Sequence, residues 1–422
     1  MNKSKRRKNL ESVKKIRKIH WMVIIICAVL IFSAASLLYS RSVYADKDYG
    51  SKISDDEKIS EELIDEQIES GNIGDIKESL RAYQDSDFHE ILPDFNPDKI
   101  IADAAKGKFE PGLSGLLQRV VRFLLMEVYV NVNIMIKLIV LVFICAILRN
   151  LKTSFLGEGV GELGFFVCYL VIVTVLIVSF ETVMNMARET INTMVAFMHA
   201  NIPVLMTLLI SSGNIVSGGV FQPILILVVE VGATFLKSIF IPLVFFSAVL
   251  SIVNNISNKF QIAKLVSLLR RIIFWSLATT LSVFVGILII QGSMGAVVDG
   301  VTSKTAKLAI GVIPVAGKYL ADAAEAVVSC ALLIKNAAGV AVMIGIVSIC
   351  LVPVLKIIAI IAIYRFVGAL VEPISDSRIT NCINDMASSL SYIMAIVVSI
   401  AIMFFISTTA LISAGNITAM IR

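Results

Sequence analysis

The chain has 422 residues and a formal net charge of +5; 57% of its residues are hydrophobic and 16% are charged. An average soluble domain has about a quarter of its residues charged, so this composition excludes an ordinary soluble globular protein and indicates a polytopic membrane protein. The expected fold class is all-α, a bundle of membrane helices, because helices satisfy their own backbone hydrogen bonds in lipid.

Residues 1–45 have the pattern of an export signal. The first 20 residues contain nine Lys and Arg against one Glu, an apolar run covers 21–39, and Val43-Tyr44-Ala45 fits a small-x-small cleavage site. We expect cleavage after Ala45. The apolar run is also nearly long enough to span a bilayer, so an uncleaved anchor is the alternative.

Residues 46–112 are expected to form a small acidic helical module outside the membrane. Between residues 46 and 110, 19 Asp and Glu stand against 8 Lys and Arg. Ile59, Leu63, Ile64 and Ile68 have helical spacing, which predicts short amphipathic helices. The module is either a docking surface for another protein or a solvated spacer.

Nine apolar runs of roughly bilayer length follow. They predict seven to nine crossings, with one or more broken or re-entrant helices. The runs cover residues 134–149, 163–183, 191–211, 216–236, 239–256, 273–291, 327–348, 350–371 and 389–412. We divide this region into a first repeat half (113–256), a basic amphipathic linker (257–272), a second repeat half (273–372), and a C-terminal loop with the last membrane helix (373–422).

Basic residues predict the orientation of these crossings. If the mature N-terminus is outside, the first crossing brings Arg149 and Lys152 to the cytoplasm, and the run ending at 256 brings the linker there too, as the positive-inside rule prefers. Apolar and basic residues of the linker fall largely on different faces, so the linker either lies along the inner leaflet or is a plain solvated connection.

Two proline positions suggest an internal repeat. Ile202-Pro203-Val204 recurs 111 residues later as Ile313-Pro314-Val315, and Pro242 recurs at the same offset as Pro353. Duplicated, proline-interrupted segments are a sequence indication of a transport site at a repeat interface, although short apolar matches also arise by chance. Helix breaks are expected at the four positions Pro203, Gly311, Pro314 and Gly317.

Charges inside apolar runs are the candidate functional residues. A central charge costs a few kcal/mol or more unless it is paired or hydrated, so we expect Glu230 and Lys335 to form a buried pair. The alternative is that Lys335 snorkels to an interface and Glu230 bonds locally. The full set of candidate path-lining or buried charges is Glu230, Asp322, Glu325, Lys335, Lys356 and Arg365.

No enzyme, metal or cofactor motif is found in the sequence. The segment Gly311 to Lys318 differs from a phosphate-binding loop in its glycine spacing, and Tyr319 replaces the required Ser or Thr. The six cysteines include no CxxC pair, and the three histidines are too dispersed to indicate a site. We therefore expect no catalytic residue, no metal, no cofactor and no nucleic-acid partner.

Three segments carry a resemblance to a known family. LLISSGNIVSGGVFQP (208–223), DGVTSKTAKLAIGVIPVAGKYLADAAEAVVSCALLIKNAAG (299–339) and LKIIAIIAIYRFVGALVEPISDSRI (355–379) resemble the stage III sporulation protein AE family. The resemblance covers most of the chain after about residue 92, and it supplies no catalytic residues.

The resemblance implies a component of the secretion-like channel complex that joins the mother-cell membrane to the forespore during endospore development. Implied partners are other stage III sporulation membrane proteins, a cytoplasmic secretion-type ATPase and a forespore membrane protein. The chain is then either the conduit or permease-like element, or a non-conducting scaffold that anchors ring-forming partners. A membrane enzyme is a third and weaker alternative, because no motif supports it.

Overall fold

Helices account for nearly all the residues that the structure, a computed structural model, describes. These residues are 71–82, 91, 96–105, 115–152, 158–256, 262–311 and 316–421, and all belong to one unit of the chain, Ser60–Arg422. The described part contains no strand, which confirms the all-α class. The predicted signal, most of the acidic module and Pro314 lie outside the described residues.

Two short helices precede the long ones. The elements in chain order are α3 (Gly71–Ala82), α5 (Pro97–Ala105), α6 (Leu116–Val130), α7 (Val132–Lys152), α8 (Glu158–Ser211), α9 (Ile215–Phe235), η1 (Leu236–Phe240), α10 (Ile241–Ile256), α11 (Ala263–Gly311), α12 (Ala316–Val371) and α13 (Ser377–Ile421). The π-helical turn η1 joins α9 to α10 without a break.

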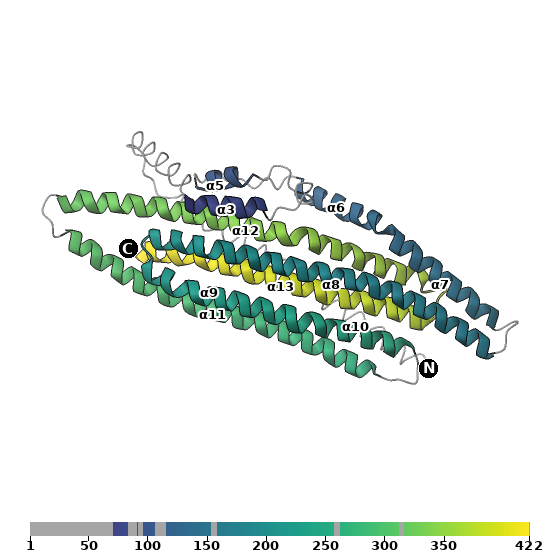
Figure 1. The fold of residues 1–422 in the computed structure, drawn as a ribbon. Coiled ribbons are helices and arrows are strands. Elements are labelled where there is room, and N and C mark those ends of the chain that lie inside the picture. The colour runs from purple at the N-terminus through teal and green to yellow at the C-terminus, as the bar shows by residue number, and fades with distance from the viewer. Residues whose placement is uncertain are drawn as a thin grey trace. The chain divides into compact units, whose positions relative to one another are not determined.

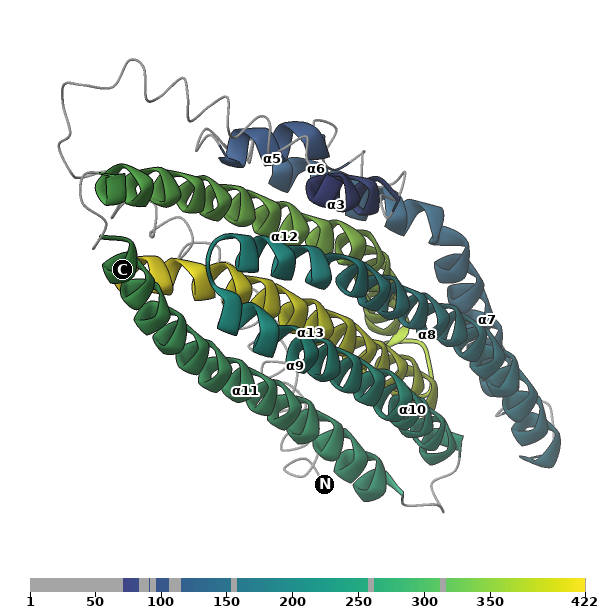
Figure 2. The ribbon, with the colours of Figure 1, turned by 60° about the vertical axis from the view of Figure 1, so that its left-hand side comes forward.

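Helix α13 is the centre of the bundle. It contacts α8, α9, α10, α11 and α12, and Figures 1 and 2 show it between α8 and α12 on one side and α9, α10 and α11 on the other. From residue 386 to 414 none of its side chains is exposed. Its serines and threonines mostly donate to carbonyls one turn earlier in the same helix, as Ser399 does to Ala395, so the centre of the bundle is packed and apolar.

Three pairs of predicted apolar runs merge into single helices. Helix α8 has 54 residues and α12 has 56, so each is about 80 Å long, more than twice the hydrocarbon thickness. Pro203 lies inside α8, which continues through it, so the predicted break at Pro203 is wrong. Packing on both sides of a proline can hold a helix together despite the lost hydrogen bond.

The number of membrane-length helices is lower than predicted. Within the described residues five helices are long and apolar enough to cross a membrane, and the bent pair α6 and α7 brings the number up to six. The expected seven to nine crossings are therefore too many, because polar residues between two runs do not end a helix. Two of the three mergers lie before the basic linker, so the number of crossings before it stays odd and its predicted side is unchanged.

Helix α3 packs on the bundle by its apolar face. Ile73, Ile76 and Leu80 are at most 2% exposed, and Ser79 Oγ donates a hydrogen bond to Asn201 Oδ1 of α8 at 3.1 Å. A Cβ added to Gly345 of α12 would lie 2.6 Å from Leu80 Cδ2, which shows how closely the two helices approach. The described parts of the acidic module, α3 and α5, thus rest on α8 and α12.

Candidate functional site

The exposed face of α8 changes character part-way along the helix. Its exposed side chains are apolar at Phe166, Val167, Leu170, Val171 and Val178. Beyond residue 180 the exposed positions become largely polar, as the sequence ETVMNMARETIN (181–192) indicates. An apolar surface suits lipid and a polar one suits water, so the first part of α8 is suited to the bilayer and the second part to an aqueous setting.

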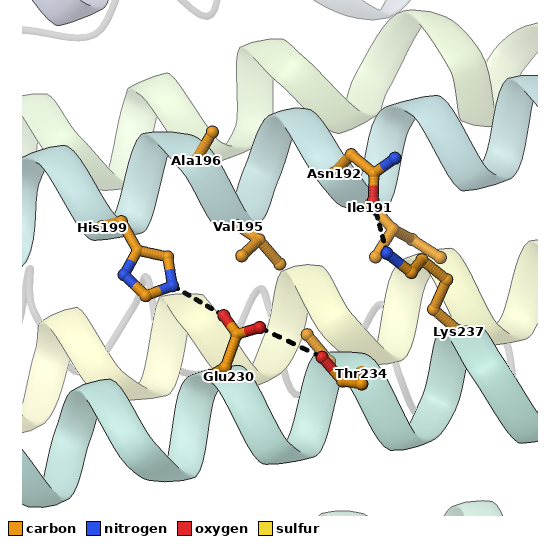
Figure 3. Close-up of a pocket in the computed structure, with 9 residues that line it drawn as sticks. Ile191, Asn192, Val195, Ala196, His199, Glu230, Thr234 and Lys237 are labelled. Carbon is orange, nitrogen blue, oxygen red and sulfur yellow. Dashed lines mark hydrogen bonds and ion pairs between the residues drawn. The ribbon is translucent and has the colours of Figure 1, made fainter.

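A groove lies between the polar part of α8 and the facing helices α9 and η1 (Figure 3). Its volume is about 340 Å³. The residues that line it are Ile191, Asn192, Val195, Ala196, His199, Glu230, Ala233, Thr234 and Lys237. The groove is therefore apolar at its floor and carries a carboxylate, an imidazole and an ammonium group at its walls.

Two polar contacts cross the groove. His199 Nε2 lies 2.7 Å from Glu230 Oε2, and Lys237 Nζ donates a hydrogen bond to Asn192 Oδ1 at 2.7 Å. Thr234 Oγ1 donates to the other carboxylate oxygen of Glu230 at 3.2 Å. The Glu230 side chain is 51% exposed and that of His199 is 40% exposed, so both remain open to molecules outside the bundle.

The predicted pair of Glu230 with Lys335 is wrong. Glu230 bonds to His199 and Thr234, whereas Lys335 is 2% exposed and its Nζ donates to the Ile412 carbonyl of α13 at 2.9 Å. Glu230 lies on an exposed face of α9, whereas Lys335 lies on a buried face of α12. Sequence spacing within each helix cannot show which faces meet. Lys335 is a buried contact between α12 and α13, not a groove residue.

The other predicted charges do not join the groove. Lys356 and Arg365 are partly exposed on α12, and Asp322 and Glu325 belong to the same helix nearer its start. Helix α11 ends at Gly311 and α12 begins at Ala316, with Gly317 in the first turn of α12. Of the predicted site residues, the groove thus contains Glu230 alone.

Sequence reasoning missed His199, Asn192 and Lys237 as site residues. The three histidines are far apart in the sequence and do not indicate a site, because the partner of His199 is Glu230 on another helix. A signal was present: Asn185, Asn192 and His199 recur at intervals of seven on one helical face, so α8 carries a polar stripe beside its apolar core face.

A second polar cluster joins three helices at the other end of the bundle. Arg270 of α11 is 8% exposed, and its Nη1 donates to Asp385 Oδ1 of α13 at 2.9 Å. Asn255 Nδ2 of α10 donates to the second oxygen of Asp385 at 3.1 Å. The chain reaches this end at the predicted basic linker, so the cluster fixes α10, α11 and α13 beside that linker.

A buried carboxylate holds the start of α9. Asp299 of α11 is 2% exposed, and its Oδ2 accepts a hydrogen bond from the Ser217 main-chain nitrogen at 2.9 Å. The residue before α9, Asn214, makes no side-chain capping bond, so Asp299 supplies from another helix the acceptor that a helix N-terminus requires. This contact fixes the turn between α8 and α9 against α11.

No metal centre is present among the described residues, since no group of three or more His, Cys, Asp or Glu side chains there could hold an ion. The site is a charged groove on the surface of a packed bundle. Such a groove can bind, exchange protons with or guide a polar molecule.

Comparison with known proteins gives two matches to one family. The model of the family described as Stage III sporulation protein AE matches residues 95–415. A curated relative, Stage III sporulation protein AE of Bacillus subtilis (strain 168), is 34% identical over 307 residues, which cover 72% of this chain and 77% of the relative. No solved structure matches the chain.

Proposed function

The chain belongs to the stage III sporulation protein AE family, and from this premise we propose that it is the conduit or permease-like element of a channel complex between mother cell and forespore. Its membrane-length helices are those of a multi-pass membrane protein. The proposed location is the mother-cell membrane that faces the forespore, and the proposed partners are other stage III sporulation membrane proteins, a cytoplasmic secretion-type ATPase and a forespore membrane protein.

The proposed orientation follows from charge. The ends of α7 and α10 and the start of α11 carry Arg149, Lys152 and the basic linker, which the positive-inside rule assigns to the cytoplasm. The turn between α8 and α9, together with α3, then lies on the extracytoplasmic side. Helix α3 lies outside the hydrocarbon in either orientation, because Glu78 and Arg81 on its exposed face require water.

The observation that carries the proposal is the charged groove between α8 and α9. The bundle interior is filled around α13, so a polar solute has no path through the described core. The groove instead offers a carboxylate, an imidazole and an ammonium group on the surface of the bundle. We propose that this surface is one wall of the path, which neighbouring subunits of the complex complete.

The same packed interior favours a second candidate, a non-conducting scaffold. In that case the polar face of α8 holds ring-forming partners and the solute path lies in those partners. An enzyme is the weakest candidate, since no sequence motif supports it.

Flux through reconstituted vesicles separates the two candidates. A full-length chain with its six cysteines replaced receives one cysteine at Ala196, in the groove, or at Val171, on the apolar exposed face. A conduit should pass a small polar dye in the presence of partners, and a bulky thiol reagent should block the Ala196→Cys variant but not the Val171→Cys variant. A scaffold should retain its partners and give no flux that either modification changes.

A further inference from the structure

Helix α6 exposes an unusual amount of apolar surface. Leu117, Leu125 and Tyr129 are 78%, 64% and 77% exposed, and Val121, Met126 and Val130 are each about half exposed. One face of the helix packs on α12, with Phe123 at 7% exposure. The remaining surface would be unfavourable in water, so something apolar must cover it.

The position of α6 along the chain shows what covers it. Helix α7 has 21 residues and a length of about 32 Å, close to the hydrocarbon thickness of about 30 Å. If the end of α7 at Lys152 lies at one membrane surface, the junction with α6 therefore lies at the other. The exposed apolar residues of α7, which include Ile136, Val140 and Phe143, continue directly into those of α6.

The junction is a fixed bend. The axes of α6 and α7 differ by 48°, and Asn131 between them donates from Nδ2 to the Glu127 carbonyl and to Glu127 Oε1, each at 2.9 Å. These bonds satisfy the end of α6 and hold the change of direction. Helix α6 is thus turned from the axis of α7 toward the plane of the membrane surface.

The basic residues of α6 lie at the end away from this bend. Arg119 and Arg122 are in its first two turns, and the last two turns contain Leu125, Met126 and Tyr129. Neither guanidinium group makes an ion pair or hydrogen bond within the described part of the chain. Guanidinium groups pair well with phosphate, and an aromatic ring with a hydroxyl suits the boundary between headgroups and acyl chains.

We infer that α6 is an interfacial helix whose apolar residues enter the acyl boundary of one leaflet and whose Arg119 and Arg122 bind phospholipid phosphates. With Arg149 and Lys152 in the cytoplasm, this leaflet is the extracytoplasmic one. The contact of α6 with lipid does not depend on whether the protein is a conduit. The occupant is lipid rather than protein because the apolar surface of α6 continues that of a membrane-crossing helix and its cations complement the headgroup charge.

Fluorescence quenching in vesicles tests the apolar contact. The cysteine-free full chain carries a polarity-sensitive label at Leu125→Cys, with Phe143→Cys on α7 and Glu78→Cys on α3 as controls, in vesicles of phosphatidylcholine and phosphatidylglycerol. We expect a nitroxide high on the acyl chain to quench position 125, a nitroxide deep in the chain to quench position 143, and aqueous iodide to quench position 78. Equal iodide quenching at 125 and 78, or no quenching of 125 by either lipid or iodide, overturns the inference.

A second measurement tests the phosphate contact. A label at Gln118→Cys, beside the arginines, should be quenched more by headgroup-labelled phosphatidylglycerol than by headgroup-labelled phosphatidylcholine. The double change Arg119→Gln and Arg122→Gln should reduce this preference severalfold, whereas Arg188→Gln on α8 should leave it unchanged. An unchanged preference in the double variant refutes the assignment of the two arginines to phospholipid phosphates. Iodide quenching at position 125 separately reports whether α6 stays in the membrane interface.

Discussion

The Nζ atom of Lys335 donates a hydrogen bond to the Ile412 carbonyl, at 2.9 Å, and this bond joins the first half of α12 to the central helix α13. One turn further along α12, a Cβ added to Gly339 would lie 2.5 Å from Ile412 Cδ1, so the two helices are in close contact here. Lys335 therefore stabilises a helix interface within the bundle, and no acidic side chain pairs with it among the described residues.

Two replacements of Lys335 should separate the contribution of its side-chain volume to stability from that of its ammonium group. Methionine fills a similar volume without a buried cation, so Lys335→Met should change the free energy of unfolding by less than about 1.5 kcal/mol. Lys335→Ala should lower it by about 2–5 kcal/mol because it leaves a cavity. Unfolding of the purified protein in detergent measures both, and an equal loss for the two variants would show that the ammonium group itself is required.

The contact of Asp299 with the start of α9 gives a second prediction. Asp299→Ala should destabilise the protein by about 1–2 kcal/mol because it removes the only acceptor described for the Ser217 main-chain nitrogen. Asp299→Asn keeps an acceptor oxygen and should have a smaller effect. Asp75→Ala, at an exposed position of α3, is the matched control and should stay within about 0.5 kcal/mol. Thermal unfolding of the four proteins compares them directly.

Arg270 and Asp385 should act as one unit. Asp385→Ala leaves the buried Arg270 cation without its partner and should lower stability by about 3–5 kcal/mol. Arg270→Ala should cost less, because the Asp385 side chain is 30% exposed and keeps its bond from Asn255. The double variant Arg270→Met with Asp385→Leu should recover much of this loss. A separate double-mutant cycle, made from the two alanine variants and their double, should give a coupling free energy of about 1–3 kcal/mol. Strict additivity would contradict the role of the pair in holding α11 to α13.

The docking of α3 depends on small size at Gly345. Its added Cβ would lie 2.5 Å from Phe197 Cζ and 2.6 Å from Leu80 Cδ2, so Gly345→Leu should displace α3. Gly286→Ala on α11 is the control, because nothing lies within 4 Å of its added Cβ and alanine favours the helix by about 1 kcal/mol. Proteolysis near residue 78 should be faster in Gly345→Leu and unchanged in Gly286→Ala.

Acid should loosen α5 from α3 through Asp98. Partial burial opposes ionisation of this carboxylate, but hydrogen bonds from Arg81 and Lys77 outweigh burial and hold its pKa below the ordinary value of 3.8. A depressed pKa contributes stability above the ordinary value, and this contribution is lost as the pH falls through the lowered one. Hydrogen exchange in α5 should therefore rise below about pH 4 relative to Asp98→Asn, after correction for the intrinsic effect of pH. Identical profiles would show that the contact adds nothing.

The fold class of this protein and the location of its apolar helices follow from local sequence patterns. Apolar runs of bilayer length require helices, because lipid offers no partner to the backbone. The family motifs in 208–223, 299–339 and 355–379 were also readable, and the comparisons confirm the family. These properties depend on residues close together in the chain.

Which helices continue past a polar segment, and which charged side chains meet, depends on packing between distant segments. Pro203 does not end α8, since packing from neighbouring helices holds its turns in place, and two runs with polar residues between them become one helix. Glu230 meets His199 instead of Lys335 because the faces that α8, α9 and α12 turn toward one another are set by packing around α13. Spacing within one helix defines its faces, but the partner of each face comes from segments far away in the sequence.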